Sequence, residues 1–385
     1  MFQLRGVLAG TLALALLAGC QRTQVDQRGY RGLGMNEVHR PAALAVVAEI
    51  NMVPKPLHKV SSAGPTAAEV YTNVQVLGDL SKPEFARLMI SFKNWVAPDV
   101  GCNYCHNAPD YASDDKYPKL IARAMIGMTR HINSDWTAHV KTTGVTCYTC
   151  HRGQPVPPKV WYSVPQVEPA IFARKASLRP PTPSAARTAL PAEALGDFLL
   201  DDLPIRIVGP TPLQDGNTHT VRQARSSYTL MMVMAESLGV NCTYCHNTRS
   251  FSSWDLSPPP RETAWYGIRM ARDLNRSYVG PLAGLLPPER LGPAGDGPKV
   301  YCATCHFGSS KPLNGARMAI DFPELVASKP YPSTGPLAAA PGLEPAPGAN
   351  PSPLAAPQAG VPQAAGTGPT STSAGVPSAP KAKTG

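Results

Sequence analysis

Four short cysteine motifs carry the most specific chemistry in this 385-residue sequence. Each is Cys-x-x-Cys-His, in which a histidine directly follows a pair of cysteines three positions apart. Two thiols at this spacing lie on one side of a turn and reach the two vinyl groups of one porphyrin, while the adjacent imidazole points at its iron. The pattern therefore predicts four covalently attached c-type haems. Their cysteines are Cys102, Cys105, Cys147, Cys150, Cys242, Cys245, Cys302 and Cys305, and their iron-ligating histidines are His106, His151, His246 and His306.

Other uses of paired cysteines fit the sequence less well. Eight cysteines in an exported chain would ordinarily indicate a disulfide scaffold, but here a histidine follows every pair. A zinc ribbon uses cysteine pairs without a histidine after each one. A thioredoxin-like redox pair lies in a strand–helix–strand unit, and the sequence shows no such pattern. We therefore favour haem over zinc or thiol–disulfide chemistry.

The presence of a sixth ligand on each iron distinguishes an electron-transfer haem from a catalytic one, because a haem with both axial positions filled cannot bind substrate. Met89, Met125 and Met231 lie on predicted helices before the first, second and third motifs, and each is a candidate thioether ligand. A methionine on an apolar helix face more commonly packs in a core. We expect Met128 and Met270 to be such core residues.

An internal repeat divides the chain into two halves that each contain two motifs. Residues 128–133, Met-Thr-Arg-His-Ile-Asn, resemble residues 270–275, Met-Ala-Arg-Asp-Leu-Asn, and each segment lies between the two motifs of its half. Residues 101–107 and 241–247 match in the same way. We infer a duplicated two-haem unit.

The repeat also makes the four haems unequal. Aligning Met128 with Met270 places Met125 opposite Gly267, so the fourth haem lacks the methionine that is available to the second. Either another residue closes this haem or it is an open catalytic site. The histidines outside the motifs are His131, His139 and His219, which are plausible donors, and His39 and His58, which are expected at the surface.

Helices are expected to position these residues. Ser81 and Glu84 form a capping box ahead of a helix, and Pro118 opens the next one. A third helix is predicted from His219 to Ser237 and a fourth from Arg261 to Tyr278. The first two helices have apolar stripes at helical spacing, made of Phe85, Leu88, Met89, Phe92 and Val96 in one and Ile121, Met125, Met128 and Ile132 in the other.

No strand pattern competes with these helices. The predicted fold is a mainly α multihaem cytochrome c with much irregular structure and little β, built from the duplicated unit. The prolines, 43 in all, gather in a connector and in a tail that is too poor in large apolar residues to fold. The predicted segments are a signal peptide (1–19), an N-terminal segment (20–80), a first two-haem half (81–158), a connector (159–218), a second two-haem half (219–322) and a disordered Pro/Ala-rich tail (323–385).

The signal peptide is of the lipoprotein type. Arg5 supplies a positive start, residues 7–18 form an apolar run, and Leu-Ala-Gly precedes Cys20. A membrane-spanning helix needs about 20 apolar residues, more than this run provides. We expect cleavage before Cys20 and lipidation of its thiol; the alternative is an ordinary signal that is removed together with Cys20. Lipidation would hold the chain at the periplasmic face of the inner membrane.

The formal net charge of +10 raises the possibility of a nucleic-acid or anionic-membrane partner, which we discount. The basic residues are dispersed and form no Lys/Arg run. Four haems would also bring on the order of two negative propionate charges each, and bound cofactors belong in any charge balance.

The residues resemble a known family, the tetrahaem cytochrome c subunit of the purple-bacterial photosynthetic reaction centre. The resemblance extends from about Gly29 to Phe322 and rests on the four motifs, on residues 136–140 (Trp-Thr-Ala-His-Val) and on residues 264–270 (Ala-Trp-Tyr-Gly-Ile-Arg-Met). It implies that Met89, Met125 and Met231 are the sixth ligands of the first, second and third haems. It also implies that His139, from the first half, closes the fourth haem opposite His306.

The resemblance further implies an electron carrier without catalytic chemistry of its own. Its third haem would lie nearest the membrane, followed by the fourth, the second and the first. It would rereduce the photo-oxidised bacteriochlorophyll special pair in the membrane-embedded L and M subunits. A soluble periplasmic cytochrome c or high-potential iron–sulfur protein would donate the electrons.

Two other classes of protein remain as alternatives. A periplasmic multihaem reductase would need one haem with an open site. A quinol-oxidising membrane cytochrome would need a true transmembrane anchor, and the short apolar run before Cys20 argues against it.

Overall fold

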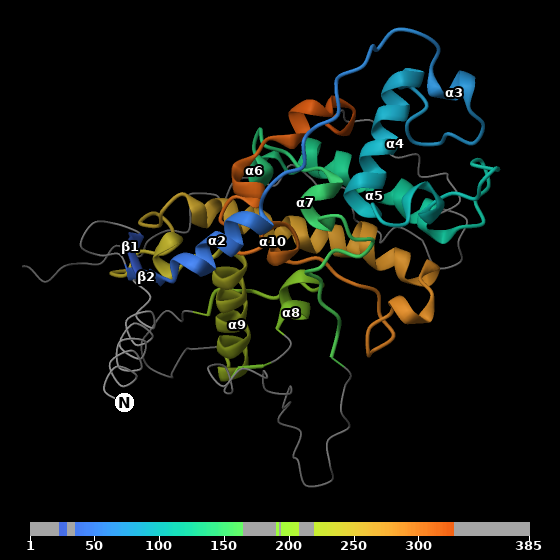
Figure 1. Cartoon of the computed structure of the whole chain (residues 1–385). Helices are drawn as coiled ribbons and strands as arrows, with labels where there is room; N and C mark the ends of the chain where they lie inside the picture. The colour runs from blue at the N-terminus through green and yellow to red at the C-terminus, as the bar shows by residue number, and fades with distance from the viewer. Residues whose placement is uncertain (1–22, 29–34, 165–189, 192–193, 208–218, 327–385) are drawn as a thin grey trace, which may run out of the picture. The chain divides into compact units, whose positions relative to one another are not determined.

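Helices and irregular segments make up most of the described chain, with one small pair of strands (Figure 1). The structure is a computed structural model and describes residues 23–28, 35–164, 190–191, 194–207 and 219–326. All of these residues belong to one unit that spans residues 1–346. The mainly α fold with little β is confirmed. The predicted signal peptide, Cys20 and the chain beyond residue 326 lie outside the described residues.

The predicted capping box starts the first long helix. In α4 (Lys82–Val96) the backbone N–H of Glu84 donates to the Ser81 hydroxyl at 3.3 Å, and the Glu84 carboxylate accepts from the backbone N–H of Ser81 at 3.0 Å. The second, α5 (Tyr117–Asp135), begins one residue before Pro118, because proline suits the first helical turn, where its missing N–H has no partner to lose. The shorter elements of this region are α3 (Ala67–Val70), the 3₁₀ turn η1 (Gly101–Tyr104), α6 (Thr137–Val140) and α7 (Cys147–His151).

The two predicted helices of the second half also form. Helix α9 (Val221–Leu238) begins at Thr220, whose hydroxyl accepts the Gln223 N–H at 3.1 Å, and ends at Gly239, whose φ of 64° is the left-handed conformation that glycine adopts readily. Helix α10 (Pro260–Leu274) ends before the predicted Tyr278, because the chain widens there into a π-helical turn, η4 (Asn275–Val279). The remaining elements are η3 (Cys242–Tyr244), η5 (Gly280–Leu285), η6 (Pro288–Arg290), α11 (Cys302–His306), η7 (Pro312–Gly315), η8 (Met318–Asp321) and η9 (Pro323–Leu325).

The N-terminal segment contains the only strands of the described chain. β1 (Gln24–Arg28) and β2 (Met35–His39) pair antiparallel and are followed by α2 (Pro41–Ile50). The pair lies against the third motif, where the backbone N–H of Asn241 donates to the buried Glu37 carboxylate at 2.5 Å. The sequence did not indicate these strands, since their residues are mostly polar and their partner surface is distant in the chain.

Two core clusters belong mainly to one half each. In the first, Leu88 and Trp95 pack with Phe322 and Leu325, so that the last described residues return to the first half. In the second, Leu230 and Ile268 pack with α8 (Leu195–Leu199), a helix within the predicted connector.

A third core cluster joins α5 to α10. Met128 and Ile132 of α5 pack with Met270 and Leu274 of α10, and Trp136 completes the cluster. Met128 and Met270 are both buried, as expected for core residues. They are also the equivalent positions of the internal repeat, so the two helices meet through matching surfaces.

A partly buried ion pair lies beside this apolar contact. The His131 imidazole has Nε2 at 2.6 Å from Oδ2 of Asp273 on α10 and Nδ1 at 2.6 Å from Oδ2 of Asp135. Burial favours the neutral imidazole, but hydrogen bonds and charge from Asp273 and Asp135 outweigh it and raise the pKa of His131.

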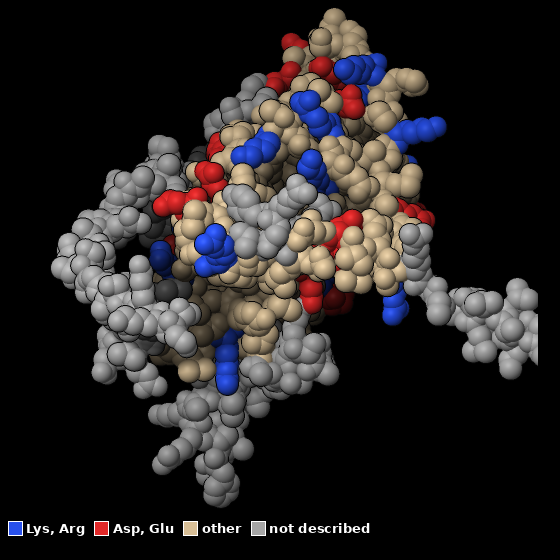
Figure 2. Space-filling model, turned by 90° about the vertical axis from the view of Figure 1, so that its left-hand side faces the viewer, with Lys and Arg blue, Asp and Glu red and all other residues tan. Residues whose placement is uncertain are grey.

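Charges of both signs share the surface. Lys and Arg side chains are interspersed with Asp and Glu over the face shown in Figure 2. Within the described ranges, no helix is long and apolar enough to cross a membrane.

We predict that the His131 ion pair makes stability depend on pH. A histidine whose pKa is raised by folding stabilises the protein fully below its unfolded pKa of about 6.5 and loses this contribution as the pH rises through the folded pKa. The free energy of unfolding of the native protein should therefore exceed that of His131→Gln by on the order of 1–2 kcal/mol near neutral pH, and by less at higher pH. Chemical denaturation between pH 6 and pH 9 measures this difference, and a constant difference would contradict the ion pair.

Candidate haem-binding sites

The four motifs occupy two kinds of short turn. The first and third lie on the 3₁₀ segments η1 and η3, and the second and fourth form the five-residue helices α7 and α11. In the first motif the His106 N–H donates to the Cys102 carbonyl at 3.0 Å, and His246 and Cys242 repeat this bond at 3.0 Å. Each turn therefore presents two thiols and one imidazole together, as covalent haem attachment requires.

A backbone carbonyl orients each motif histidine. One ring nitrogen, Nδ1, lies within hydrogen-bond distance of a carbonyl that follows the motif in the chain. A donor at Nδ1 leaves Nε2 free to bind a metal, which fixes the ring as a ligand. The pairs are His106 with Tyr111 at 3.0 Å, His151 with Gln154 at 2.8 Å, His246 with Phe251 at 2.9 Å and His306 with Ser309 at 2.9 Å.

Burial keeps these imidazoles in the neutral form that iron needs. It lowers the pKa of His106, His151 and His246. Burial and the neighbouring His139 together lower the pKa of His306 to about 4. A neutral imidazole binds a metal without first losing a proton.

Two of the four orienting carbonyls also accept from a cation. Lys119 Nζ donates to the Tyr111 carbonyl at 3.1 Å, and Arg261 Nη1 donates to the Phe251 carbonyl at 3.2 Å. Lys119 and Arg261 are equivalent positions when Met128 is aligned with Met270. The repeat therefore contained a signal for these residues that the sequence analysis did not use.

The cysteines fit thioether formation better than zinc binding. All eight motif cysteines are free thiols. Burial raises the pKa of Cys147 and Cys302 to about 12 and that of Cys105 and Cys245 to about 11, which disfavours the thiolate that zinc requires. Among the described residues, no three His, Cys, Asp or Glu side chains gather as a metal site.

The second and fourth motifs touch one another. The Sγ atoms of Cys150 on α7 and Cys305 on α11 lie 2.7 Å apart. These are the second cysteines of their motifs and hold equivalent places in the two halves. Haem groups attached here would be mounted on adjoining turns.

The candidate methionine ligands differ in burial from the core methionines. Met89 lies on α4, Met125 on α5 and Met231 on α9, and all three are only partly buried. Met128 and Met270 are buried. The side chains of Met89, Met125 and Met231 are therefore still accessible to a bound group, whereas those of Met128 and Met270 are not.

His139 faces a motif histidine of the other half. It stands on α6, and its ring centre lies 6.1 Å from that of His306, with the ring planes at 69°. Two imidazoles that bind one metal from opposite sides, with nitrogens at about 2 Å from it, place their ring centres on the order of 6 Å apart. Nδ1 of His139 lies 2.8 Å from the Thr263 carbonyl, and burial lowers the pKa of this imidazole.

Gly267 provides the space for this imidazole. A Cβ atom at Gly267 would lie 2.6 Å from Cε1 and 2.8 Å from Nδ1 of His139. The glycine that the repeat places opposite Met125 is therefore the position where the His139 ring rests. The residues present fit a haem held between His306 and His139.

The other histidines lie elsewhere. Both ring nitrogens of His131 are engaged by aspartates. His219 lies just before α9, His58 is exposed, and His39 is partly buried with Nε2 at 3.6 Å from Glu37.

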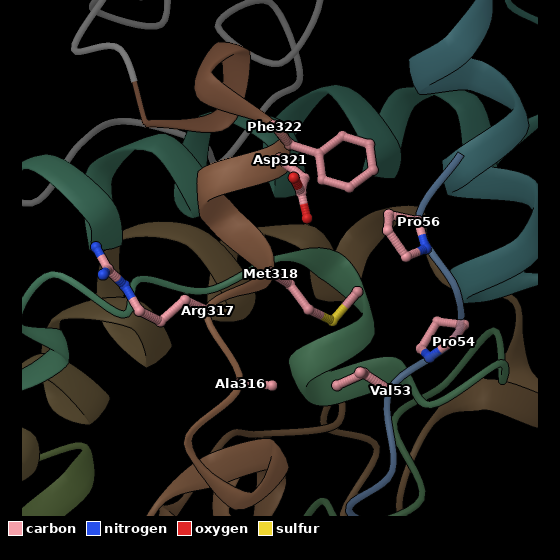
Figure 3. Close-up of a pocket in the computed structure, with 8 residues that line it drawn as sticks. All are labelled: Val53, Pro54, Pro56, Ala316, Arg317, Met318, Asp321 and Phe322. Carbon is pink, nitrogen blue, oxygen red and sulfur yellow. The ribbon is translucent and has the colours of Figure 1, made fainter. Parts of the chain in front are cut away.

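A separate cavity of about 130 Å³ lies between residues 53–56 and 316–322. Figure 3 shows the Met318 thioether reaching toward Val53 and Pro54. Its lining is largely apolar and contains no cysteine or histidine. We assign it no part in haem attachment.

We predict that Gly267→Ala weakens ligation by His139. The added methyl group overlaps the imidazole, which must move away from His306. The expected result is a full complement of attached haem with a new high-spin fraction that binds carbon monoxide. Gly284→Ala is the matched control, because a Cβ there meets nothing within 4 Å. A fully low-spin Gly267→Ala protein would contradict this role of the glycine.

Comparison with known proteins places these features in a family. Residues 19–326 match the family described as "Photosynthetic reaction centre cytochrome C subunit". Three similar proteins are each described as "Photosynthetic reaction center cytochrome c subunit". The protein of Rubrivivax gelatinosus is 47% identical over 85% of this chain and 90% of its own. The protein of Thermochromatium tepidum is 45% identical over 82% of this chain and 78% of its own. The protein of Roseobacter denitrificans is 35% identical over 83% of this chain and 90% of its own.

The match covers all four motifs, both repeats and the residues around His139. Members of this family are electron carriers rather than enzymes, and they hold covalently bound c-type haem. The chain belongs to the family of photosynthetic reaction centre cytochrome c subunits.

Proposed function

We propose that this chain rereduces the photo-oxidised bacteriochlorophyll special pair through four covalently bound haems. The special pair lies in the membrane-embedded L and M subunits of the reaction centre. The observation that carries the proposal is the set of four turns with oriented histidines, together with a fifth imidazole, His139, opposite the last of them. Bound haem supplies reversible one-electron chemistry, and the protein supplies ligands, position and surroundings.

The proposed axial ligands follow from the residues that the chain offers. His106, His151, His246 and His306 bind from the motif side. Met89, Met125 and Met231 complete the first, second and third sites, as the family resemblance implies, and their partial burial is compatible with this role. His139 completes the fourth site from the other half, supported by its ring distance to His306 and by the space at Gly267.

Eight axial ligands for four irons distinguish this proposal from a multihaem reductase. A reductase needs one iron with an open position, and the only site that lacked a methionine has His139 opposite its histidine. Filled axial positions favour electron transfer and exclude substrate.

The proposed location is the periplasmic face of the inner photosynthetic membrane. A lipid on Cys20 would anchor the chain there. A soluble cytochrome c or high-potential iron–sulfur protein would donate electrons to the first haem. The electrons would then pass along the order implied by the family, through the second and fourth haems to the third.

Flash spectroscopy on membranes tests the proposal. After a single flash, the absorption of reduced haem should bleach as the oxidised pair recovers, at matching rates. Membranes that lack this chain serve as the control and should show slow recovery. Recovery at the control rate in membranes that contain the haem-loaded chain would contradict the proposal.

We predict that His139→Met raises the midpoint potential of the fourth haem. Thioether ligation favours the ferrous state relative to imidazole ligation. A redox titration should show one haem shifted upward and three unchanged. His58→Met is the control, since His58 is exposed and outside the proposed sites. Four unchanged potentials in His139→Met would remove His139 from the ligand set.

A further inference from the structure

His139 stands on a helix too short to fix the direction of its own side chain. α6 has four residues, and none of them is buried. A single turn has little stability by itself, because helix nucleation costs more than its one hydrogen bond returns. Its N-cap, Trp136, is also the C-cap of α5, and its C-cap is Lys141, whose φ of 54° is outside the helical range. The position of the His139 ring must therefore depend on contacts from outside α6.

Helix α10 contacts this turn at two points. The Thr263 carbonyl lies 2.8 Å from Nδ1 of His139. At the start of the turn, the indole N–H of Trp136 donates to Oδ2 of Asp273 at 3.0 Å and also lies 3.2 Å from Nε2 of His131. The backbone carbonyl of the same Trp136 accepts the His139 N–H at 2.8 Å. Trp136 thus connects the backbone of His139 to Asp273, which lies six residues beyond Gly267 on α10.

Asp273 is held as a carboxylate. Nε2 of His131 lies 2.6 Å from its Oδ2, and the Ser277 hydroxyl donates to its Oδ1 at 2.9 Å. Burial favours the protonated acid, but hydrogen bonds from His131 and Trp136 lower the pKa of Asp273. The charge matters because an ionised acceptor binds an N–H donor about twice as strongly as a neutral one.

We infer that Asp273 is a positioning residue for His139. By accepting the hydrogen bond from the Trp136 indole, Asp273 fixes the position and the ring orientation of the imidazole that faces His306. The inference rests on the proposed function, in which His139 and His306 bind one iron. Within this linkage, only His139 is a proposed iron ligand. Asp273 therefore acts through another residue and not on the iron.

The linkage has a spectroscopic signature. The planes of the two rings stand at 69°. The magnetic anisotropy of a low-spin ferric iron with two imidazole ligands depends on this angle. If the Asp273–Trp136 contact were only structural, its loss would change the stability of the protein and leave the electronic properties of the site unchanged. If Asp273 positions His139, the loss of this contact changes both.

The test is electron paramagnetic resonance of the oxidised holoprotein, with the full chain and all haems attached. Asp273→Asn keeps the shape of the side chain and removes its charge. We expect a shift of the largest g value of the His/His haem and a shift of its midpoint potential, with the three Met/His haems unchanged. Ser277→Ala is the matched control, because it removes the hydrogen bond that Asp273 accepts from the following turn, η4, and leaves the Trp136 contact in place; its spectrum should equal that of the native protein. Native signals in Asp273→Asn would overturn the inference.

Two further variants keep the outcomes separate. His139→Met should remove the His/His signal altogether. If the signal persists in His139→Met, both the assignment of His139 as a ligand and the role of Asp273 are wrong. If the signal is lost in His139→Met and native in Asp273→Asn, the positioning role alone fails. Trp136→Phe keeps the ring and removes the N–H donor, so it should shift the same signal if Asp273→Asn does not assemble. A native signal in assembled Trp136→Phe would equally overturn the inference.

Discussion

A single turn that must present two thiols and an imidazole to one porphyrin is the constraint on which this structure depends. A turn this short cannot fix the direction of its histidine ring by itself. In every motif, a backbone carbonyl that follows in the chain lies within hydrogen-bond distance of the histidine Nδ1 and orients the ring. Helices α4, α5 and α9 carry the half-buried Met89, Met125 and Met231. Buried apolar side chains of the described chain form three separate clusters.

The two halves meet through equivalent positions. Met128 packs in one cluster with Met270, His131 pairs with Asp273, and Cys150 touches Cys305. Contact between matching residues is the pattern of an isologous interface, in which the same surface is used twice. It supports the proposed duplication. It also brings α6, which carries the proposed ligand His139, against α10 of the second half.

The sequence predicted the parts of the structure that depend on local patterns. The capping box at Ser81, the proline start of α5 and the motif turns follow from spacing along the chain. The vacancy opposite Met125 was also visible, because the repeat placed Gly267 there. The strands β1 and β2, the burial of Glu37 and the core helix α8 were not predictable, since each is stabilised by residues far away in the chain. The pairing of His131 with Asp273 was present in the repeat alignment, but a repeat alone does not say that equivalent residues touch.

The return of the last described residues to the first half has a consequence for how the chain is made. Phe322 and Leu325 complete the cluster around Leu88 and Trp95, and Arg130 donates to the Glu324 carbonyl at 2.9 Å. A chain exported from its N-terminus, as the proposed signal peptide implies, would deliver these residues after all four motifs. The cluster around Leu88 and Trp95 would then be completed only after the second half had emerged.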